Sequence, residues 1–533
     1  MPTTISIDGR SLDLSRLAAV AAGDAVTLDP SVVEQIKASR RVVERVLATE
    51  RTVYGINTGF GRLSSKRVAP DQLRQLQRNL VRSHSAGVGE NLPVHQVRAM
   101  MALRANSLVQ GYSGVRLELI QALLAALNAG ITPLVPSRGS VGASGDLAPL
   151  AHVALGLMGE GQCHYQGRNL AAAEALTAAG LTPVEYEAKE ALALINGTQL
   201  MTAVGGLALE RAGRLLKAAD IVGAMSLEAL LGTDSVFDPA IHACRPHPGQ
   251  VQVAENLRRC LSGSELIASH VDCPKVQDPY SLRCIPQVHG ASRDGWTWAV
   301  SVVEREMNAA SDNPVVLPES DRIMSGGNFH GAPVALALDC AAVALSYLGS
   351  MSERRCDKLL NPDESGLPAF LVRDSGLNSG LMLTQYVSAA LVNEIKVLSH
   401  PASSDSVPTS AGHEDHVSMG PGAAYKLEVV VKNLEQILAN EWVCACQALE
   451  FHRPLSFGPA TEIGLAVLRE RVAPVTDDRP LAEDLAIARE LIECGQLVAR
   501  VETSLGSLER IEPARGAPTR RHYADSAVED PLS

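Results

Sequence analysis

A mainly α-helical fold, with a long central antiparallel helix bundle and a smaller mixed N-terminal region, is predicted from three observations. First, 46% of the 533 residues are hydrophobic but only 3% are aromatic, a composition that suits closely packed helices better than sandwiches or barrels. Second, the chain after Asn196 contains apolar segments that are too long for strands: 206–231, 291–310, 332–349, 378–399 and 422–451. Third, the last segment carries a stripe at helical spacing that is typical of a bundle core, formed by Leu427, Val431, Leu434, Leu438 and Trp442.

The N-terminal part mixes short elements before helices take over. A β-like piece covers 4–7, a helix is expected around 32–48, and a glycine-rich turn covers 54–61. Ser113 is the expected N-cap of a helix whose apolar positions step by three and four, and Gly130 is its expected end. The predicted domains are a mostly helical N-terminal region at 1–200, a central and C-terminal helical bundle at 201–511, and a polar, disordered tail at 512–533.

Charge and targeting signals exclude several classes of function. The net charge of −12 argues against a nucleic-acid partner, which would require clustered Lys and Arg. The N-terminus has no basic region followed by an apolar core, so a cytoplasmic location is expected. The segment 332–349 is apolar nearly all round, but Pro333 and Asp339 interrupt it and basic flanks are absent, which favours a bundle centre over a membrane span. Such an apolar helix needs many neighbours, which predicts a homo-oligomer.

Cysteine and histidine spacing contains no readable disulfide framework or metal motif. The ten cysteines include no Cys-x-x-Cys pair, so free thiols are expected. His242, Cys244 and His247 form an isolated trio in a Pro-rich loop, and His413 and His416 lack the His-Glu-x-x-His spacing. No metal site is therefore predicted.

A cluster of glycines and other small residues at 139–145, in the stretch GSVGASGD, precedes an apolar helix expected to run through Leu157. Glycine clusters persist where the backbone turns sharply or is approached closely. Spacing excludes three familiar sites. A phosphate loop needs Lys after its last glycine, where this chain has Asp146. A dinucleotide turn needs Gly-x-Gly-x-x-Gly, and a hydrolase elbow needs its second glycine at the position of Asp146.

The residues Ala143, Ser144 and Gly145 offer a different chemistry, in which the backbone itself reacts. In a tight turn the amide nitrogen of Gly145 can reach the carbonyl carbon of Ala143 and close a five-membered ring, an approach that only a residue without Cβ allows. Loss of water, including the hydroxyl of Ser144, leaves a 4-methylidene-imidazol-5-one (MIO) electrophile that needs no external cofactor. The amides that start the following helix are expected to stabilise negative charge on the ring oxygen. On its own, Ala-Ser-Gly is also a common structural turn.

Motifs in order along the chain resemble those of the aromatic amino-acid ammonia-lyase and aminomutase family, from about Val53 to about Glu450. They are YGINTGFG (54–61), SHSAGVG (83–89), GSVGASGDLAPLAH (139–152), LINGTQ (194–199), QDPYSLR (277–283), SDNP (311–314), GGNFH (326–330) and EDHVSM (414–419). The resemblance implies a fumarase/aspartase-like helical architecture and a small-molecule amino-acid substrate. It also implies a homotetramer whose active sites are each assembled from more than one subunit.

The segment 277–283 also has a physical logic of its own. Asp278 can N-cap a helix and Pro279 can occupy its first position, which sets Tyr280 and Arg283 three apart on one face. The Arg283 guanidinium is suited to a bidentate grip on a substrate carboxylate. An ion pair with a neighbouring side chain is the commoner arrangement for an arginine.

The resemblance implies roles for individual residues. Tyr54, Ser144 and Tyr280 are the implied catalytic residues, and Ala143, Ser144 and Gly145 are the implied source of the MIO group. Tyr54 is implied to remove the β-proton, which requires its phenolate to be favoured by nearby positive charge or backbone donors. The implied substrate-binding residues are His84, Asn196, Gln277, Arg283, Phe329 and Glu414.

His84 and Glu414 match positions that contact an imidazole in the histidine-specific branch of the family, and an imidazole needs both a donor and an acceptor. The expected reaction is non-oxidative deamination of L-histidine to trans-urocanate and ammonia. The chain departs from that branch at His413, at Gly331-Ala332 and at NPDESGLPAF (361–370), the last being similar to the arylalanine branch. A tyrosine or phenylalanine ammonia-lyase or 2,3-aminomutase, a fumarase-type lyase that uses side chains only, and a non-catalytic helical assembly stay open as alternatives.

Overall fold

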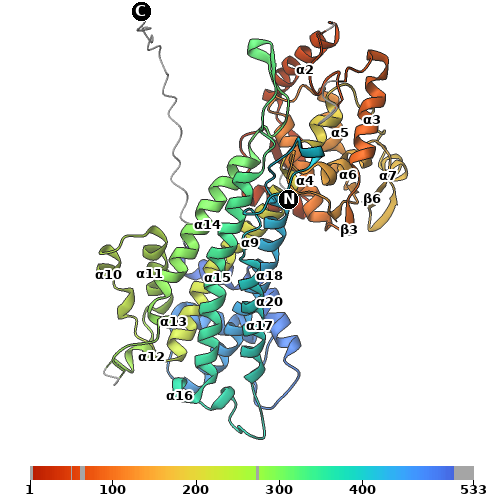
Figure 1. Ribbon diagram of the computed structural model, residues 1–533. Coiled ribbons are helices and arrows are strands. Elements are labelled where there is room, and N and C mark those ends of the chain that lie inside the picture. The colour runs from red at the N-terminus through yellow and green to blue at the C-terminus, as the bar shows by residue number, and fades with distance from the viewer. Residues whose placement is uncertain (1–3, 50, 60–65, 272–274, 509–533) are drawn as a thin grey trace, which may run out of the picture.

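A bundle of long helices runs through most of the length of the molecule (Figure 1). The structure, a computed structural model, describes residues 4–49, 51–59, 66–271 and 275–508. The bundle helices are α9 (Gln199–Ala229), α14 (Ile285–Met307), α15 (Ala332–Leu360), α17 (Met382–Leu398) and α18 (Gly420–Leu449). These helices confirm the apolar segments predicted from the sequence, and the predicted tail at 512–533 lies outside the described residues.

Helices α15 and α18 form the centre of the bundle, packing on each other and on α9 and α17. The predicted stripe on α18 is fully buried, and its Trp442 indole nitrogen donates to the carbonyl of Gly464 at 3.2 Å. Among the described residues, α15 is the helix that is long and apolar enough to cross a membrane by length and composition alone. Because 61% of its most apolar stretch is buried inside the fold, it is packed as a core helix is.

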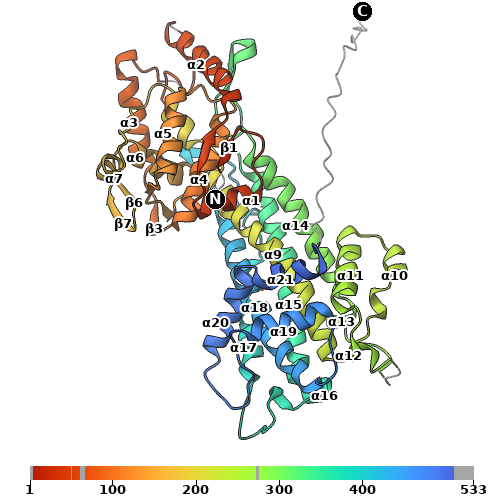
Figure 2. The ribbon, with the colours of Figure 1, turned by 180° about the vertical axis from the view of Figure 1, so that it is seen from behind.

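A smaller mixed region lies at one end of the bundle (Figure 2). Its helices are α1 (Leu14–Ala22), α2 (Val33–Leu47), α3 (Leu73–His84), α4 (Val94–Leu108), α5 (Leu117–Asn128), α6 (Leu147–Leu157), α7 (Ala172–Ala178) and α8 (Glu190–Ile195). Its strands are β1 (Ile5–Ile7), β2 (Val26–Leu28), β3 (Val88–Asn91), β4 (Thr132–Pro133), β5 (Pro136–Arg138), β6 (Gln162–Tyr165) and β7 (Arg168–Ala171). Strand β1 pairs with β2 in parallel, β3 pairs with β5, and the remaining three form a sheet of order β4-β6-β7.

The helix predicted after Ser113 begins later than expected. Helix α5 starts at Leu117, and Ser113 is buried and does not cap it. The backbone N–H of Arg116, just before the helix, donates instead to the carboxylate of Glu190 in α8 at 3.0 Å. A carboxylate 74 residues away therefore fixes the backbone where this helix begins, and the helix has no side-chain cap. The predicted end is confirmed, because Gly130 follows α5 with a φ of +76°.

The remaining elements flank the bundle. They are α10 (Pro239–Ala243), α11 (Pro248–Leu261), α12 (Glu265–Ala268), α13 (Tyr280–Arg283), α16 (Pro362–Ser365), α19 (Pro459–Arg469), α20 (Ala482–Glu493) and α21 (Gln496–Leu505), with a hairpin of β8 (Val315–Leu317) and β9 (Arg322–Met324). Helix α13 contacts α14 and α15 within the bundle, whereas the hairpin reaches back to α2 (Figure 1). The boundary predicted at residue 200 stays a prediction.

Candidate active site

A cavity of about 1000 Å³ gathers most of the predicted site residues. Its walls come from the end of α3, the loop before α6, the end of α8, and loops at 313–330 and 410–416. The predicted residues that line it are Tyr54, His84, Ala143, Ser144, Asn196, Phe329 and Glu414. Segments far apart in the sequence therefore meet around the glycine-rich loop.

The glycine cluster is explained by a close crossing of two backbone segments. Gly145 has a φ of +73° and forms a bridge with Gly197, just after α8. A Cβ at Gly145 would lie 2.3 Å from the carbonyl oxygen of Gly197, and the next amide, that of Asp146, donates to this oxygen at 2.6 Å. A Cβ at Gly142 would lie 2.1 Å from the Ser418 hydroxyl. The bare backbone is thus required by packing on two sides.

This crossing predicts a specific cost for a side chain at position 145. We expect Gly145→Ala to lower the free energy of unfolding by about 3 kcal/mol or more, because it combines a left-handed φ with a backbone clash. Gly130→Ala is the matched control, since Gly130 has a similar φ of +76° but a Cβ there would meet nothing within 4 Å among the described residues. Left-handed strain alone costs about 1 kcal/mol there. Urea unfolding measures the free energy of unfolding of both variants. Equal losses in the two would contradict the close backbone crossing at Gly145.

Polar contacts fix the loop on the cavity wall. The carbonyl oxygen of Ser144 accepts from Asn196 Nδ2 at 2.7 Å, and its hydroxyl donates to Glu414 Oε1 at 2.6 Å. The other Glu414 oxygen accepts from the Thr409 hydroxyl at 2.7 Å. The Ser144 carbonyl therefore has the Asn196 side chain as a donor, and stabilisation of a ring oxygen by the first amides of α6 stays a prediction. The loop also pairs with the opposite wall through the Met419 amide and the Val141 carbonyl, 2.9 Å apart.

Asp146 lies directly after the loop and is fully buried. Its Oδ1 accepts from the Ser140 hydroxyl and its Oδ2 from the Met201 amide, each at 3.0 Å. Burial raises the pKa of this carboxyl from 3.8 to about 7, and the two hydrogen bonds oppose the rise.

The raised pKa of Asp146 predicts a pH-dependent stability. Because the folded state favours the protonated Asp146 carboxyl, protonation of this group adds to the free energy of unfolding. This contribution is fully present below pH 3.8 and is lost as the pH rises through about 7. We expect Asp146→Asn, which cannot ionise, to remove that loss, on the order of 4 kcal/mol at most. Urea unfolding across this pH window measures it. Wild-type and variant curves that run parallel between these pH values would contradict the assignment.

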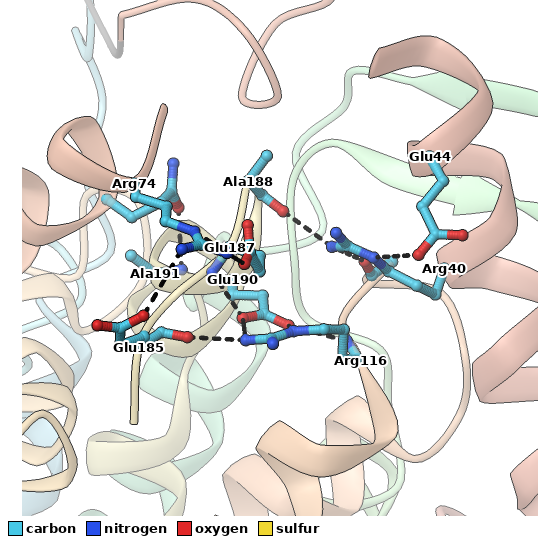
Figure 3. A network of polar contacts seen from close by, with 11 residues as sticks. Arg40, Glu44, Arg74, Arg116, Glu185, Glu187, Ala188, Glu190 and Ala191 are labelled. Atoms are coloured by element: carbon cyan, nitrogen blue, oxygen red, sulfur yellow. Dashed lines mark hydrogen bonds and ion pairs between the residues drawn. The ribbon is translucent and has the colours of Figure 1, made fainter. Parts of the chain in front are cut away.

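An ion-pair network holds the segment that leads into α8 and thus Asn196 (Figure 3). Arg116 Nη2 pairs with Glu190 Oε2 at 2.7 Å, Arg74 Nη2 with Glu187 Oε1 at 2.6 Å, and Arg40 Nη1 donates to the Ala188 carbonyl at 3.1 Å. Next to them, the buried pair of Lys189 and Asp312 is joined at 2.8 Å. Sequence reasoning missed this support, because each contact joins distant segments and no local pattern marks it.

Imidazole rings form much of the remaining wall. Burial lowers the pKa of His84, whose Nδ1 lies 2.9 Å from the Leu80 carbonyl oxygen. The rings of His330 and His416 stack in parallel with centroids 5.9 Å apart, and His330 Nε2 lies 3.2 Å from the His416 carbonyl oxygen. His413 lines the same cavity. With Glu414, these groups make the wall polar and rich in hydrogen-bonding atoms.

Four predicted residues do not line this cavity: Gly145, which is buried next to Ser144, and Gln277, Tyr280 and Arg283. Tyr280 and Arg283 belong to α13, beside the bundle and apart from the N-terminal region (Figure 1). Their predicted juxtaposition is confirmed, because Arg283 Cζ lies 4.5 Å from the centre of the Tyr280 ring. Tyr280 is 69% exposed. Within the described parts of the chain, the buried Arg283 Nε has no hydrogen-bond partner.

The predicted start of this helix is wrong by one residue. Helix α13 begins at Tyr280, with Pro279 before it in an extended conformation. Asp278 does not cap it, because its Oδ2 accepts from the amide of Thr233 at 2.7 Å, after the end of α9. The side chain therefore anchors the segment to the bundle.

Comparisons with known proteins agree with this geometry. A family model described as aromatic amino acid lyase matches residues 12–470. The chain is 52% identical to a histidine ammonia-lyase of Myxococcus xanthus over 94% of its length and 99% of the relative's. It is similar to the crystal structure of histidine ammonia-lyase from Trypanosoma cruzi, with a TM-score of 0.88 and 43% identity over 94% of this chain and 95% of that one. It is also similar to a tyrosine aminomutase of Streptomyces globisporus, with a TM-score of 0.90 and 37% identity over 94% of this chain and 99% of that one.

Proposed function

Because the chain belongs to the aromatic amino acid lyase family, we propose that it is an ammonia-lyase that converts L-histidine to trans-urocanate and ammonia. The observation that carries the proposal is the cavity in which the Ala143–Gly145 loop faces His84 and Glu414. The name of the relative from Myxococcus xanthus, at 52% identity over nearly the whole chain, supports the same reaction.

Three features of the loop support its self-cyclisation to MIO. Gly145 adopts a left-handed φ, its neighbour Asp146 is bound to Gly197, and the Ser144 hydroxyl projects to the cavity wall at Glu414. Asn196 Nδ2 already donates to the Ser144 carbonyl oxygen, the oxygen that would become the ring carbonyl. Once formed, the group supplies an electrophile that draws electron density from the substrate. Intact mass tests this step, because a cyclised chain is lighter by two water molecules.

The side chains around the loop then divide the remaining work. Asn196 holds the ring carbonyl through Nδ2, and its buried Oδ1, which has no partner among the described residues, is free to accept from the substrate amine. Tyr54 on the cavity wall is the proposed base for the β-proton. Phe329 covers the apolar part of the substrate. His84 and Glu414 bind the imidazole, one as donor and one as acceptor.

A second copy of the chain supplies the rest of the site in this proposal. Arg283 is suited to the substrate carboxylate, yet it lies on α13 outside the cavity, as do Gln277 and Tyr280. An apolar strip on the outside of α15 and α17 is the kind of face that another subunit would cover. It consists of Leu336, Val343, Tyr347, Leu383, Tyr386 and Val387, all exposed. The homotetramer with shared sites, and a cytoplasmic location, are parts of the proposal.

A substrate panel tests the reaction. The purified protein is expected to release ammonia from L-histidine with a rise in ultraviolet absorbance from urocanate, and to act far less on L-tyrosine and L-phenylalanine. A tyrosine or phenylalanine aminomutase is the second candidate, since the fold is equally similar to a tyrosine aminomutase. That activity would return the amine to the β-carbon, so β-amino acid among the products would select it. No product from any of these amino acids would contradict both.

A further inference from the structure

Arg104, in the middle of α4, is a buried arginine without an ion-pair partner among the described residues. Its Nη1 is directed at the carbonyl oxygens of Asn196 (3.0 Å) and Ser311 (3.2 Å) and at Gln199 Oε1 (2.9 Å). Its Nε and Nη2 have no hydrogen-bond partner within the described chain. Burial lowers the pKa of this guanidinium to about 10, so it stays charged at neutral pH.

Such an arrangement is costly, because a buried charge with unpaired N–H groups loses its hydration, and the carboxylate that attracts it, Asp312, is bound to Lys189 instead. The three oxygens that receive Nη1 come from adjacent segments: Asn196 in the turn between α8 and α9, Gln199 at the first position of α9, and Ser311 in the loop after α14. The turn consists of residues 196–198. The arginine therefore holds this turn through polar contacts. Its desolvation costs free energy that a hydrophobic side chain packed in the same place would not lose.

The turn is also the surface against which the reactive loop is pressed. A Cβ at Gly197 would lie 2.2 Å from Arg104 Nη1 on one side, and a Cβ at Gly145 would lie 2.3 Å from the Gly197 oxygen on the other. Gly197 is thus packed between Arg104 and Gly145, with no room for a side chain at either contact. From the same turn, Asn196 Nδ2 reaches the Ser144 carbonyl and the Gly197 carbonyl binds the Asp146 amide.

We propose that Arg104 is a positioning residue for the self-cyclisation of residues 143–145, acting through the turn at 196–198 that it holds against the loop. The inference rests on the proposed function, because it assumes that this loop forms MIO. Arg104 does not contact the reacting atoms. It sets the position of the backbone against which the Gly145 nitrogen must approach the Ala143 carbonyl carbon.

The reaction that Arg104 would position is balanced without any oxidant or reductant. The Gly145 nitrogen bonds to the carbonyl carbon of Ala143, whose oxygen leaves as water with the protons of the Gly145 and Ser144 amides. A carbon–nitrogen double bond forms between Ala143 and Ser144. A second water leaves with the Ser144 hydroxyl and the proton on its Cα, which forms the exocyclic double bond.

Intact mass of the full-length chain, followed over time after cell-free synthesis, measures this cyclisation directly. Arg104→Met is expected to slow the loss of two waters roughly a hundredfold, since small displacements of reacting atoms have effects of that size. Arg104→Lys keeps the charge but has a single donor nitrogen. Its cyclisation rate is therefore expected to lie between those of wild type and Arg104→Met. If Arg104→Met does not accumulate as folded protein, Arg104→Lys carries the test.

Arg98 supplies the matched control, because it is a buried arginine on the same helix whose donors bind the backbone carbonyls of Val20, Asp24 and Leu127. None of these three residues lines the cavity. Arg98→Met is expected to lose stability in urea yet cyclise at the wild-type rate. Wild-type cyclisation in the Arg104 variants, or equal slowing in Arg98→Met, would overturn the inference. A wild-type chain that never loses two waters would instead overturn the proposed function.

Discussion

Ser144→Ala is expected to lower kcat with L-histidine by on the order of 10⁴-fold or more, the scale of losing a group that forms a covalent bond in catalysis. Alanine has no hydroxyl to leave, so the exocyclic double bond cannot form and the electrophile is lost. The absorbance of urocanate measures the rate. The carbonyl of residue 144 can still accept from Asn196, so the fold around the loop should persist.

Ser325→Ala is the matched control for this loss. Ser325 lines the same cavity, and its hydroxyl donates to Asn313 Oδ1 at 3.2 Å. The kcat of Ser325→Ala is expected to stay within about tenfold of wild type, since one neutral hydrogen bond contributes about 1 kcal/mol. A Ser144→Ala protein that turns over almost normally would favour a lyase that uses side chains only.

Arg283→Met is expected to lower kcat/KM at least roughly a hundredfold, because a charge-assisted bidentate contact with the substrate carboxylate contributes about 3 kcal/mol or more. The kcat/KM of Arg283→Lys should lie between those of wild type and Arg283→Met, since lysine keeps the charge but cannot form the two parallel hydrogen bonds. Much of the effect should appear in KM, because the carboxylate does not change during the reaction. Unchanged kinetics in Arg283→Met would remove this residue from the site.

The position of Arg283 on α13, outside the cavity that holds Ser144, makes complementation possible. Coexpression of Ser144→Ala with Arg283→Met should restore activity, because some sites in mixed oligomers would combine an intact loop with an intact arginine from another chain. Two affinity tags, one on each variant, verify that mixed oligomers have formed. If verified mixed oligomers stay inactive, both residues must act within a single chain.

The helical bundle could be predicted from sequence because its signal is repeated at many positions. The apolar stripe on α18 extends over several turns, and every member of it is buried. Helix starts were less predictable, because single contacts decide them. Ser113 and Asp278 look like N-caps locally, but α5 begins only after Arg116, whose amide binds Glu190, and Asp278 is bound to Thr233. Neither partner is visible from the neighbouring sequence.

Motif resemblance, more than local physics, predicted which residues share the cavity. Tyr54, His84, Asn196, Phe329 and Glu414 come from different elements, and no periodicity relates them. The residues that support this cavity could not be predicted from sequence for the same reason. Arg104 did leave a weak signal, because α4 is buried around almost its whole circumference and an arginine there must find buried acceptors. Its acceptors, however, lie on segments that only the folded chain brings near.

The contact between Gly145 and Gly197 has a consequence for how any preparation of this protein can be judged. Gly145 and Gly197 meet where α6 and α8 pack together, so under the proposed cyclisation a newly made or misassembled chain would keep ordinary peptide bonds and an intact serine. The missing mass would then serve as a permanent record that a given molecule once reached its native arrangement. The fraction of lighter chains in a sample would count those molecules, including any that have since unfolded.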